Sequence, residues 1–235
     1  MISDTFLDRT IEQKFIEQND KERENHKSSG KLSASQLNNP LQWQILKVLE
    51  VPQKELEEYV LRKFFRGKQI ENWLVSEMPD ILETQKLIEY NRCIGFADVV
   101  VDTKNWDFKV GIIPAEIKSV SNAKFRRILS GGGADKGHIL QAAYYALGME
   151  KEQFAVIYCA SDDLRIKTLI YQTKDYRPEI DGIIDLFYKA LESKTIPVFE
   201  ARESWQSNLA YNQYPDFMKL SIKELQEKYN QLTKK

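Results

Sequence analysis

The sequence predicts an α/β protein in which a central mixed β-sheet is flanked by helices, with helical additions at both ends. Two runs rich in β-branched residues, 99–101 and 110–113, flank a polar turn at 105–107, a pattern typical of a hairpin. Two further strand-like runs, FAVIYCA and LRIKTLIYQT, are joined by three polar residues. Helical apolar spacing precedes and follows these strands, which favours helices packed on a sheet.

Length and composition indicate a soluble globular protein. The chain has 235 residues, 42% hydrophobic and 29% charged, and therefore suits one domain with additions. We expect no membrane span, because no run approaches about eighteen uninterrupted apolar residues. The first ten residues lack a basic start followed by an apolar core, so we expect no secretory signal and a cytoplasmic location. Cys93 and Cys159 lie in apolar runs and are expected to be buried free thiols.

Three segments are expected along the chain. Residues 1–31 hold a helical stripe followed by a polar linker, which contains a solvated His26, and the first helix could contact a protein partner. Residues 32–197 form the main domain. Residues 198–235 are an aromatic and helical extension, whose last helix begins at a capping box formed by Ser221 and Glu224.

Two more helices are expected between residue 31 and the first hairpin. Ser33 or Ser35 can cap one over 37–49, and a long second helix is expected over 52–78. Gly67 in its middle suggests close approach by a neighbouring element. Glu71 extends the apolar stripe of this helix. Either its side chain reaches solvent from the edge of the stripe, or it serves a polar site.

Acidic side chains interrupt the strands of the predicted hairpin. Glu116 and Lys118 point to one side of their strand, because strand side chains alternate, and Asp98 can approach the same side if the strands pair. Crowded carboxylates are costly unless a cation or a polar network takes them up, and a hard divalent metal held by oxygens is the simplest explanation. The alternative is an ordinary hairpin with a surface Glu–Lys pair.

A basic segment and a polar helix follow the hairpin. The net charge of −1 does not indicate a general nucleic-acid binder, so a polyanion would need a local basic patch. Such a patch is expected in a glycine-containing loop, where basic residues could grip phosphates or merely be surface charge: Lys124, Arg126, Arg127 and Lys136. Asp135 can cap the next helix, on which polar residues share one side: His138, Gln141 and Tyr145. These could contact phosphate, Lys118 or a base edge, or be hydrogen-bonded boundary residues.

These motifs, in this order, resemble a known family. The G-x-x-D that ends at Asp98, followed by E-x-K at 116–118, resembles the PD-(D/E)XK nuclease superfamily. Gln141 and Tyr145 as Q-x-x-x-Y, and an opening phrase LSASQLNNP, are similar to its RecB-type branch. The resemblance covers residues 32–197 and implies a restriction-endonuclease-like core.

The resemblance also implies roles for individual residues. Metal ligands would come from Glu71, Asp98, Glu116 and the backbone carbonyl of Ile117. Only oxygen ligands are present, which favours Mg²⁺ or Mn²⁺. Asp98, Glu116, Lys118, Gln141 and Tyr145 would form the catalytic set, and His138 would join the basic residues that bind nucleic acid. CRISPR-associated adaptation nucleases of this branch carry an iron–sulfur cluster, which two cysteines cannot supply.

The expected function is metal-dependent hydrolysis of DNA phosphodiesters, with end processing or single-strand cutting preferred. Such an activity would serve recombination, repair or phage and mobile-element DNA metabolism. Two alternatives stay open: a non-cleaving nucleic-acid-binding scaffold, and a restriction-type double-strand endonuclease. The sequence leaves DNA versus RNA and the cleavage polarity undecided.

Overall fold

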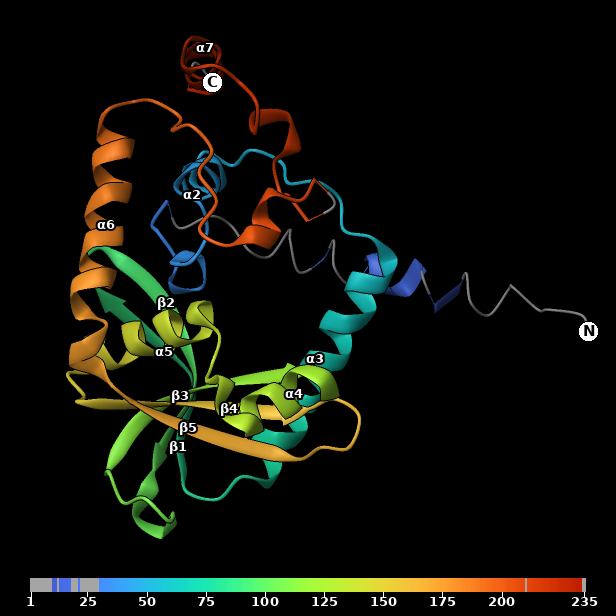
Figure 1. Cartoon of the computed structure of the whole chain (residues 1–235), viewed down its shortest axis with the longest axis vertical. Helices are drawn as coiled ribbons and strands as arrows, with labels where there is room; N and C mark the ends of the chain where they lie inside the picture. The colour runs from blue at the N-terminus through green and yellow to red at the C-terminus, as the bar shows by residue number, and fades with distance from the viewer. Residues whose placement is uncertain (1–9, 12, 18–20, 22–29, 210, 234–235) are drawn as a thin grey trace, which may run out of the picture.

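The computed structural model describes residues 10–11, 13–17, 21, 30–209 and 211–233. Its centre is the predicted mixed sheet, with five strands in the order β1-β2-β3-β4-β5 (Figure 1). Only β3 and β4 pair in parallel, and the other neighbours are antiparallel. The strands are β1 Ile81–Tyr90, β2 Cys93–Asp102, β3 Ile112–Val120, β4 Gln153–Ala160 and β5 Ile166–Gln172.

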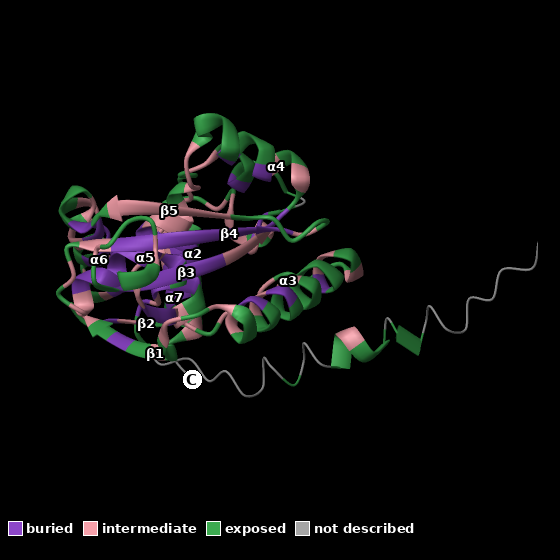
Figure 2. Cartoon of the chain, turned by 90° about the horizontal axis from the view of Figure 1, so that it is seen from below, coloured by how far each residue is buried: buried purple, intermediate pink, exposed green. Residues whose placement is uncertain are grey.

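Helices cover both faces of the sheet. The larger core lies on one face and is formed with α2 (Leu41–Val48), α5 (Lys136–Gly148) and α6 (Arg177–Glu192). On the other face, α3 (Glu58–Glu77) packs a short apolar stripe against β2, β3 and β4. Burial colouring shows β3 and β4 as buried strands, whereas α3 is exposed along most of its length (Figure 2). The strands that carry the predicted acidic site are therefore held between two helical layers.

The first two helices begin later than the sequence suggested. Pro40, not a serine, precedes α2, and the hydroxyls of Ser33 and Ser35 lie 2.7 Å apart and bond each other. Residues 51–57 are not helical, and α3 starts at Glu58. The expectation for Gly67 was also wrong, because a Cβ at this position would meet nothing within 4 Å.

The first strand, β1, was not anticipated. It pairs with β2 through a two-residue turn, Asn91-Arg92, in which both residues have positive φ (45° and 65°). Such a turn is the type I′ connection that suits the twist of a hairpin. Near the turn the hairpin packs closely on α5: a Cβ on Gly95 would stand 2.6 Å from Ala34 Cβ and 2.8 Å from Tyr145 Cε1. Only glycine lets the strand approach this closely.

The segment after β3 is helical instead of an open loop. α4 (Asn122–Arg127) is capped by the Ser121 side chain and runs into a π-helical segment, Ile128–Gly132. Asp135 stands at the N-cap position of α5, as predicted, but its side chain accepts no capping hydrogen bond from that helix. Lys124, Arg126 and Arg127 therefore lie on this short helix, which contacts β4, whereas Lys136 is the first residue of α5.

The C-terminal extension packs on the larger core. The ring of Trp43 lies 6.0 Å from that of Phe199 and 6.2 Å from that of Trp205, and α7 (Ile222–Leu232) begins with the predicted Ser221–Glu224 capping box. Short 3-10 segments complete the connections: Ala34–Gln36, Thr103–Asn105, Thr173–Asp175, Ser204–Ser207 and Pro215–Phe217.

Little of the N-terminal segment falls within the described residues. Those at 10–11 and 13–17 are helical, and the Phe15 ring meets the Phe65 ring of α3 edge-on at 5.2 Å, whereas His26 lies outside the described part. Cys93 and Cys159 are buried free thiols, as predicted. Within the described ranges, no helix is long and apolar enough to span a bilayer.

Candidate active site

The predicted hairpin between β2 and β3 separates at Asp98. Backbone pairing runs from Asp102 opposite Ile112 to Val99 opposite Ala115. At the next step, the N–H of Ile117 donates to Asp98 Oδ2 at 2.8 Å instead of to a β2 carbonyl. A strand residue directs its N–H and C=O toward the same neighbour, so the Ile117 carbonyl also faces this gap. A carboxylate and a backbone carbonyl thus line the notch between the two strands.

Glu116 is the most deeply buried acid of the site. Its residue is 0% exposed, and its carboxylate forms an ion pair with the Lys118 ammonium. Neither of its oxygens accepts a hydrogen bond of ordinary geometry from the described residues. Burial raises the pKa of Glu116 to about 8; the Lys118 charge opposes this shift, and the Asp98 charge reinforces it. A fully buried carboxylate with so few partners is costly unless something else binds it.

Asp98 and Lys118 complete a tightly coupled group. Burial raises the pKa of Asp98, against the Lys118 charge and the hydrogen bond from Ile117. Burial would lower the pKa of Lys118, but the charges of Glu116 and Asp98 outweigh burial and raise that pKa above its usual value. Lys118 therefore stays protonated. The sequence expectation that two carboxylates and one ammonium share a small patch of sheet agrees with this geometry.

Glu71 approaches this group from α3. It is partly buried, and its Oε1 accepts from Lys68 Nζ at 3.3 Å and from Gln85 Nε2 at 3.2 Å. Its charge raises the pKa of Asp98 and of Glu116, which places it within electrostatic reach of both. Glu71 thus belongs to a polar network at the edge of the notch.

The notch offers oxygen donors to a hard cation. Asp98 and Glu116 are electrostatically coupled there, and the Ile117 carbonyl faces the same gap. The Glu116 carboxylate, which is paired with Lys118, fits such a ligand. Within the described part of the chain, no three His, Cys, Asp or Glu side chains are grouped closely enough to hold a metal by themselves. Mg²⁺ commonly keeps several waters and uses only one or two carboxylates, so two carboxylates and a carbonyl suit its chemistry.

The polar residues of α5 divide into two pairs. Gln141 Nε2 donates to the Tyr145 hydroxyl at 2.7 Å, and Tyr145 is 1% exposed. Burial first, and then the nearby Glu116 charge, raise the pKa of Tyr145, so its hydroxyl stays protonated. His138 instead meets the Tyr158 hydroxyl through Nδ1 at 2.8 Å. Burial, with the Lys118 and Lys124 charges, lowers the pKa of His138 to about 3, so this ring is neutral.

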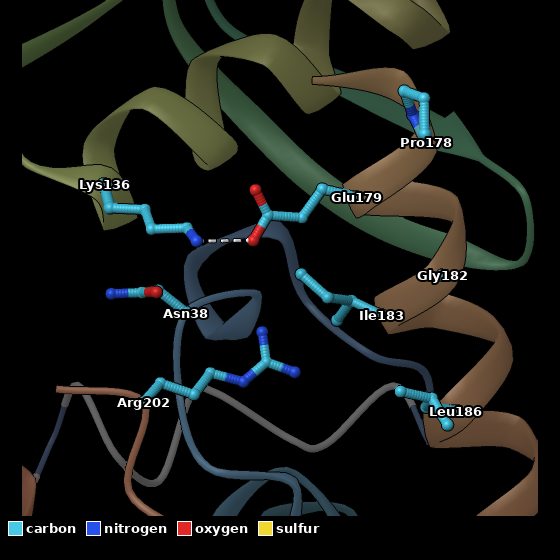
Figure 3. Close-up of a pocket in the computed structure, with 8 residues that line it drawn as sticks. All are labelled: Asn38, Lys136, Pro178, Glu179, Gly182, Ile183, Leu186 and Arg202. Carbon is cyan, nitrogen blue, oxygen red and sulfur yellow. Dashed lines mark ion pairs between the residues drawn. The ribbon is translucent and has the colours of Figure 1, made fainter. Parts of the chain in front are cut away.

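The predicted basic residues do not form one continuous patch. Lys124 and Arg127 both pair with Asp135, the latter at 2.8 Å. Lys136 instead pairs with Glu179 on α6 at 2.7 Å, and both side chains line a pocket of about 450 Å³ (Figure 3). Arg126 is exposed on α4. Most of these side chains thus have an acidic partner already.

Gln85 is the residue of this region that sequence reasoning missed. It stands on β1 opposite Asp98, between the pairs Thr84–Val99 and Lys86–Ala97, and has a left-handed φ of 48°. Such a backbone conformation is uncommon for a non-glycine residue in a strand and often marks a functional position. The turn at 91–92 was the available signal, because Asn favours the positive φ of a type I′ turn and would have indicated a strand before it.

Comparison with known proteins supports the fold. No protein-family model matches the chain, and no curated protein matches it. The crystal structure of SSO0001 superposes with a TM-score of 0.55 and 17% identity, covering 92% of this chain and 98% of that one. An alkaline exonuclease from Laribacter hongkongensis superposes with a TM-score of 0.50 and 14% identity, covering 71% of this chain and 90% of the exonuclease.

At these identities the likeness is one of fold. The chain has a restriction-endonuclease-like α/β fold, a mixed sheet between helical layers, as the sequence predicted. One of the solved proteins that share this fold is an alkaline exonuclease.

Proposed function

We propose that the protein is a metal-dependent nuclease that hydrolyses phosphodiester bonds of DNA and belongs to the RecB-type branch. The observation that carries this proposal is the buried Glu116. Its oxygens lack ordinary hydrogen bonds, it is paired with Lys118, and it lies at the point where Asp98 separates two strands. An expensive arrangement of this kind indicates a ligand that offsets the negative charge.

Asp98, Glu116 and the Ile117 carbonyl would hold Mg²⁺ or Mn²⁺, with Glu71 contributing through water. When bound, such an ion polarises a phosphate and lowers the pKa of a coordinated water. Lys118, kept protonated by its acidic neighbours, would offset the negative charge that develops on the phosphate. Gln141 orients the Tyr145 hydroxyl, which would align the phosphate to be cut.

For the finer activity we propose cutting at DNA ends or in single strands. The alkaline exonuclease that shares the fold supports this choice. A role in recombination, repair or phage DNA metabolism, inside the cell, would follow from such an activity. The non-cleaving scaffold is the second candidate, favoured by the absence of a preformed three-carboxylate site among the described residues.

One assay separates these candidates. End-labelled and circular DNA, single- and double-stranded, would be incubated with the protein and Mg²⁺, Mn²⁺ or Ca²⁺. We expect cutting with Mg²⁺ or Mn²⁺, none with Ca²⁺ and none in excess EDTA, because Ca²⁺ geometry positions water poorly. Resistance of circular substrates would identify an exonuclease. Robust cutting in EDTA would contradict the metal mechanism, and tight binding without cutting would favour the scaffold.

A further inference from the structure

Asp135 pairs with two cations instead of capping its helix. It stands at the N-cap of α5 with the extended backbone of a capping residue (φ −68°, ψ 141°), yet its side chain accepts no hydrogen bond from that helix. Its carboxylate forms ion pairs with Lys124 and with Arg127 of α4, the latter at 2.8 Å. This carboxylate therefore has two possible sets of partners, the α4 cations and the first N–H groups of α5.

The backbone around Asp135 is anchored by two tyrosines. The Asp135 N–H donates to the Tyr158 hydroxyl at 3.0 Å, and the Ala134 N–H donates to the Tyr171 hydroxyl at 2.9 Å. Because the main chain is held, a change of partner for the carboxylate needs only a rotation of its side chain. The ion pairs are also accessible to a ligand, since each of the three side chains that form them is at least 31% exposed.

The Asp135 cluster lies next to Lys118 of the candidate site. Lys118 on β3 and Tyr158 on β4 are partners in the parallel register, so their side chains point to the same face of the sheet. The Tyr158 hydroxyl meets both the Asp135 N–H and, at 2.8 Å, Nδ1 of His138. Burial lowers the pKa of His138, and the charges of Lys118 and Lys124 lower it further, so this ring lies within electrostatic reach of both cations.

We propose that Lys124 and Arg127 form a subsite for the backbone phosphate next to the scissile one, and that Asp135 occupies this subsite in the free protein. The proposal rests on the proposed nuclease function and deepens it, because it names an internal competitor for the nucleic acid. A carboxylate and a phosphate present the same kind of anionic oxygens to ammonium and guanidinium groups. When a phosphate takes both cations, the Asp135 side chain can turn to the first N–H groups of α5, which have no partner within a helix.

A purely structural role explains the arrangement less well. Solvent-exposed ion pairs contribute little to stability, so the folded protein gains little by giving up a helix cap for them. As a competitor, in contrast, Asp135 weakens the binding of every polyanion at the subsite. A polyanion that also has a phosphate at Lys118 and at the metal keeps enough contacts to displace the carboxylate. The competitor thus favours binding in the position suited to cleavage.

The test compares DNA affinity with and without the competing carboxylate. Asp135→Asn removes the charge, keeps the size and can still cap α5, and Asp135→Ser is a second variant with the same properties except size. Fluorescence anisotropy of a labelled single-stranded oligonucleotide, in EDTA to prevent cutting, measures Kd for the full chain. Glu179→Gln is the matched control, because it removes the same charge and releases Lys136, the residue next to Asp135. Thermal melting of each variant checks the fold.

We expect Asp135→Asn to bind roughly tenfold more tightly than wild type, the factor for a subsite that is free about one tenth of the time. Glu179→Gln should stay within about twofold of wild type, because its lysine lies outside the subsite. The gain must also depend on the two cations. In a chain that carries Lys124→Gln and Arg127→Gln, the further change Asp135→Asn should alter Kd by less than about twofold.

The outcomes separate the subsite from the nuclease function. The competition is overturned by unchanged or weaker binding of Asp135→Asn, by an equal gain in Glu179→Gln, or by a gain that persists without Lys124 and Arg127. Failure of both Asp135 variants to fold would make the ion pairs structural and overturn it as well. In each of these cases, cutting by wild-type protein with Mg²⁺ leaves the nuclease function standing. If the cation-dependent gain is found but wild-type protein never cuts, the subsite belongs to a binding module.

Discussion

Glu116 determines how the stability of the metal-free protein responds to pH. Its folded pKa of about 8 lies above the usual 4.5, so between these values the folded carboxyl is protonated while the unfolded one is ionised. The stability that this group contributes is present below about pH 4.5 and is lost as the pH rises through 8. Relative to Glu116→Gln, wild-type protein should lose roughly 1 kcal/mol per pH unit in this window.

Urea unfolding in EDTA at several pH values between 5 and 8 measures this difference. Comparison with Glu116→Gln is necessary because His138 works in the other direction. Its pKa is lowered to about 3, so its contribution to stability grows as the pH rises to about 6.5. Equal pH dependence of the two proteins would show that Glu116 is already ionised in the folded state.

The same carboxylates should be indispensable for cutting. Glu116→Gln and Asp98→Asn should abolish Mg²⁺-dependent cleavage, because each removes a proposed metal ligand. The fold should stay intact, because each amide replaces a carboxyl group whose ionised form is disfavoured by burial. Single-turnover cleavage and thermal melting of each variant check the two halves of this prediction. Near-wild-type rates in either variant would mean that other acids hold the metal.

Lys118→Ala should lose most of the cleavage rate yet keep its affinity for metal. The ammonium is proposed to act on the phosphate and the developing charge, not on the ion. Calorimetric titration with Mn²⁺, beside single-turnover cleavage, separates the two effects. Weak metal binding with a normal rate at saturating Mn²⁺ would assign Lys118 to the metal site instead.

At the scale of elements, close packing of the β1–β2 hairpin on α5 aligns Tyr145. Gly95→Ala places a Cβ 2.6 Å from Ala34 and 2.8 Å from the Tyr145 ring, so the hairpin must shift. We expect about 1–3 kcal/mol of destabilisation and slower cleavage at saturating substrate. Gly67→Ala is the control: its Cβ meets nothing, and it should stabilise α3 by up to about 1 kcal/mol with unchanged cleavage.

Denaturant unfolding and single-turnover rates measure both glycine variants. A stable and fully active Gly95→Ala would mean that the position of Tyr145 does not depend on the hairpin. Loss of cleavage in Gly67→Ala would mean that the position of Glu71, one helical turn further along α3, depends on this glycine.

The elements that the sequence predicted are those with local signals. The β-branched runs of β2 and β3, the strand-like runs of β4 and β5, and the Ser221–Glu224 box depend on neighbouring residues alone. The start of α3, in contrast, depends on residues that are distant in the sequence. Residues before it are held extended by a distant partner, since the Lys54 N–H donates to the Gln213 carbonyl at 2.9 Å. No local pattern reports such a contact.

In the candidate site, too, only the features that depend on local sequence signals could be predicted. The convergence of Asp98, Glu116 and Lys118 could be predicted because strand pairing and alternation bring them together. The pairing of Lys124 and Arg127 with Asp135, and of Lys136 with Glu179, depends on how α4, α5 and α6 pack. Gln85 was missed because it lies on a strand, β1, whose charged composition hides its pattern.

At the scale of the whole molecule, the net charge of −1 requires that DNA affinity come from a local field. Arg126 is the basic residue that we test, because it is exposed on α4, whereas its neighbours Lys124 and Arg127 already pair with Asp135. Arg126→Ala should weaken binding of every single-stranded sequence alike. It should also reduce the slope of log K against log salt by about 0.7, the value for one phosphate contact.

Lys223→Ala is the matched control for that prediction. It removes the same charge from an exposed position on α7, which lies at the far end of the molecule from α4 (Figure 1). Fluorescence anisotropy at several salt concentrations measures the slope of log K against log salt. We expect Lys223→Ala to have the same slope as wild type, because phosphate contacts act within about a Debye length. Equal slopes for wild type and Arg126→Ala would remove α4 from the DNA path. If Arg126→Ala and Lys223→Ala lost DNA affinity equally, the overall charge of the protein, and not α4, would govern binding.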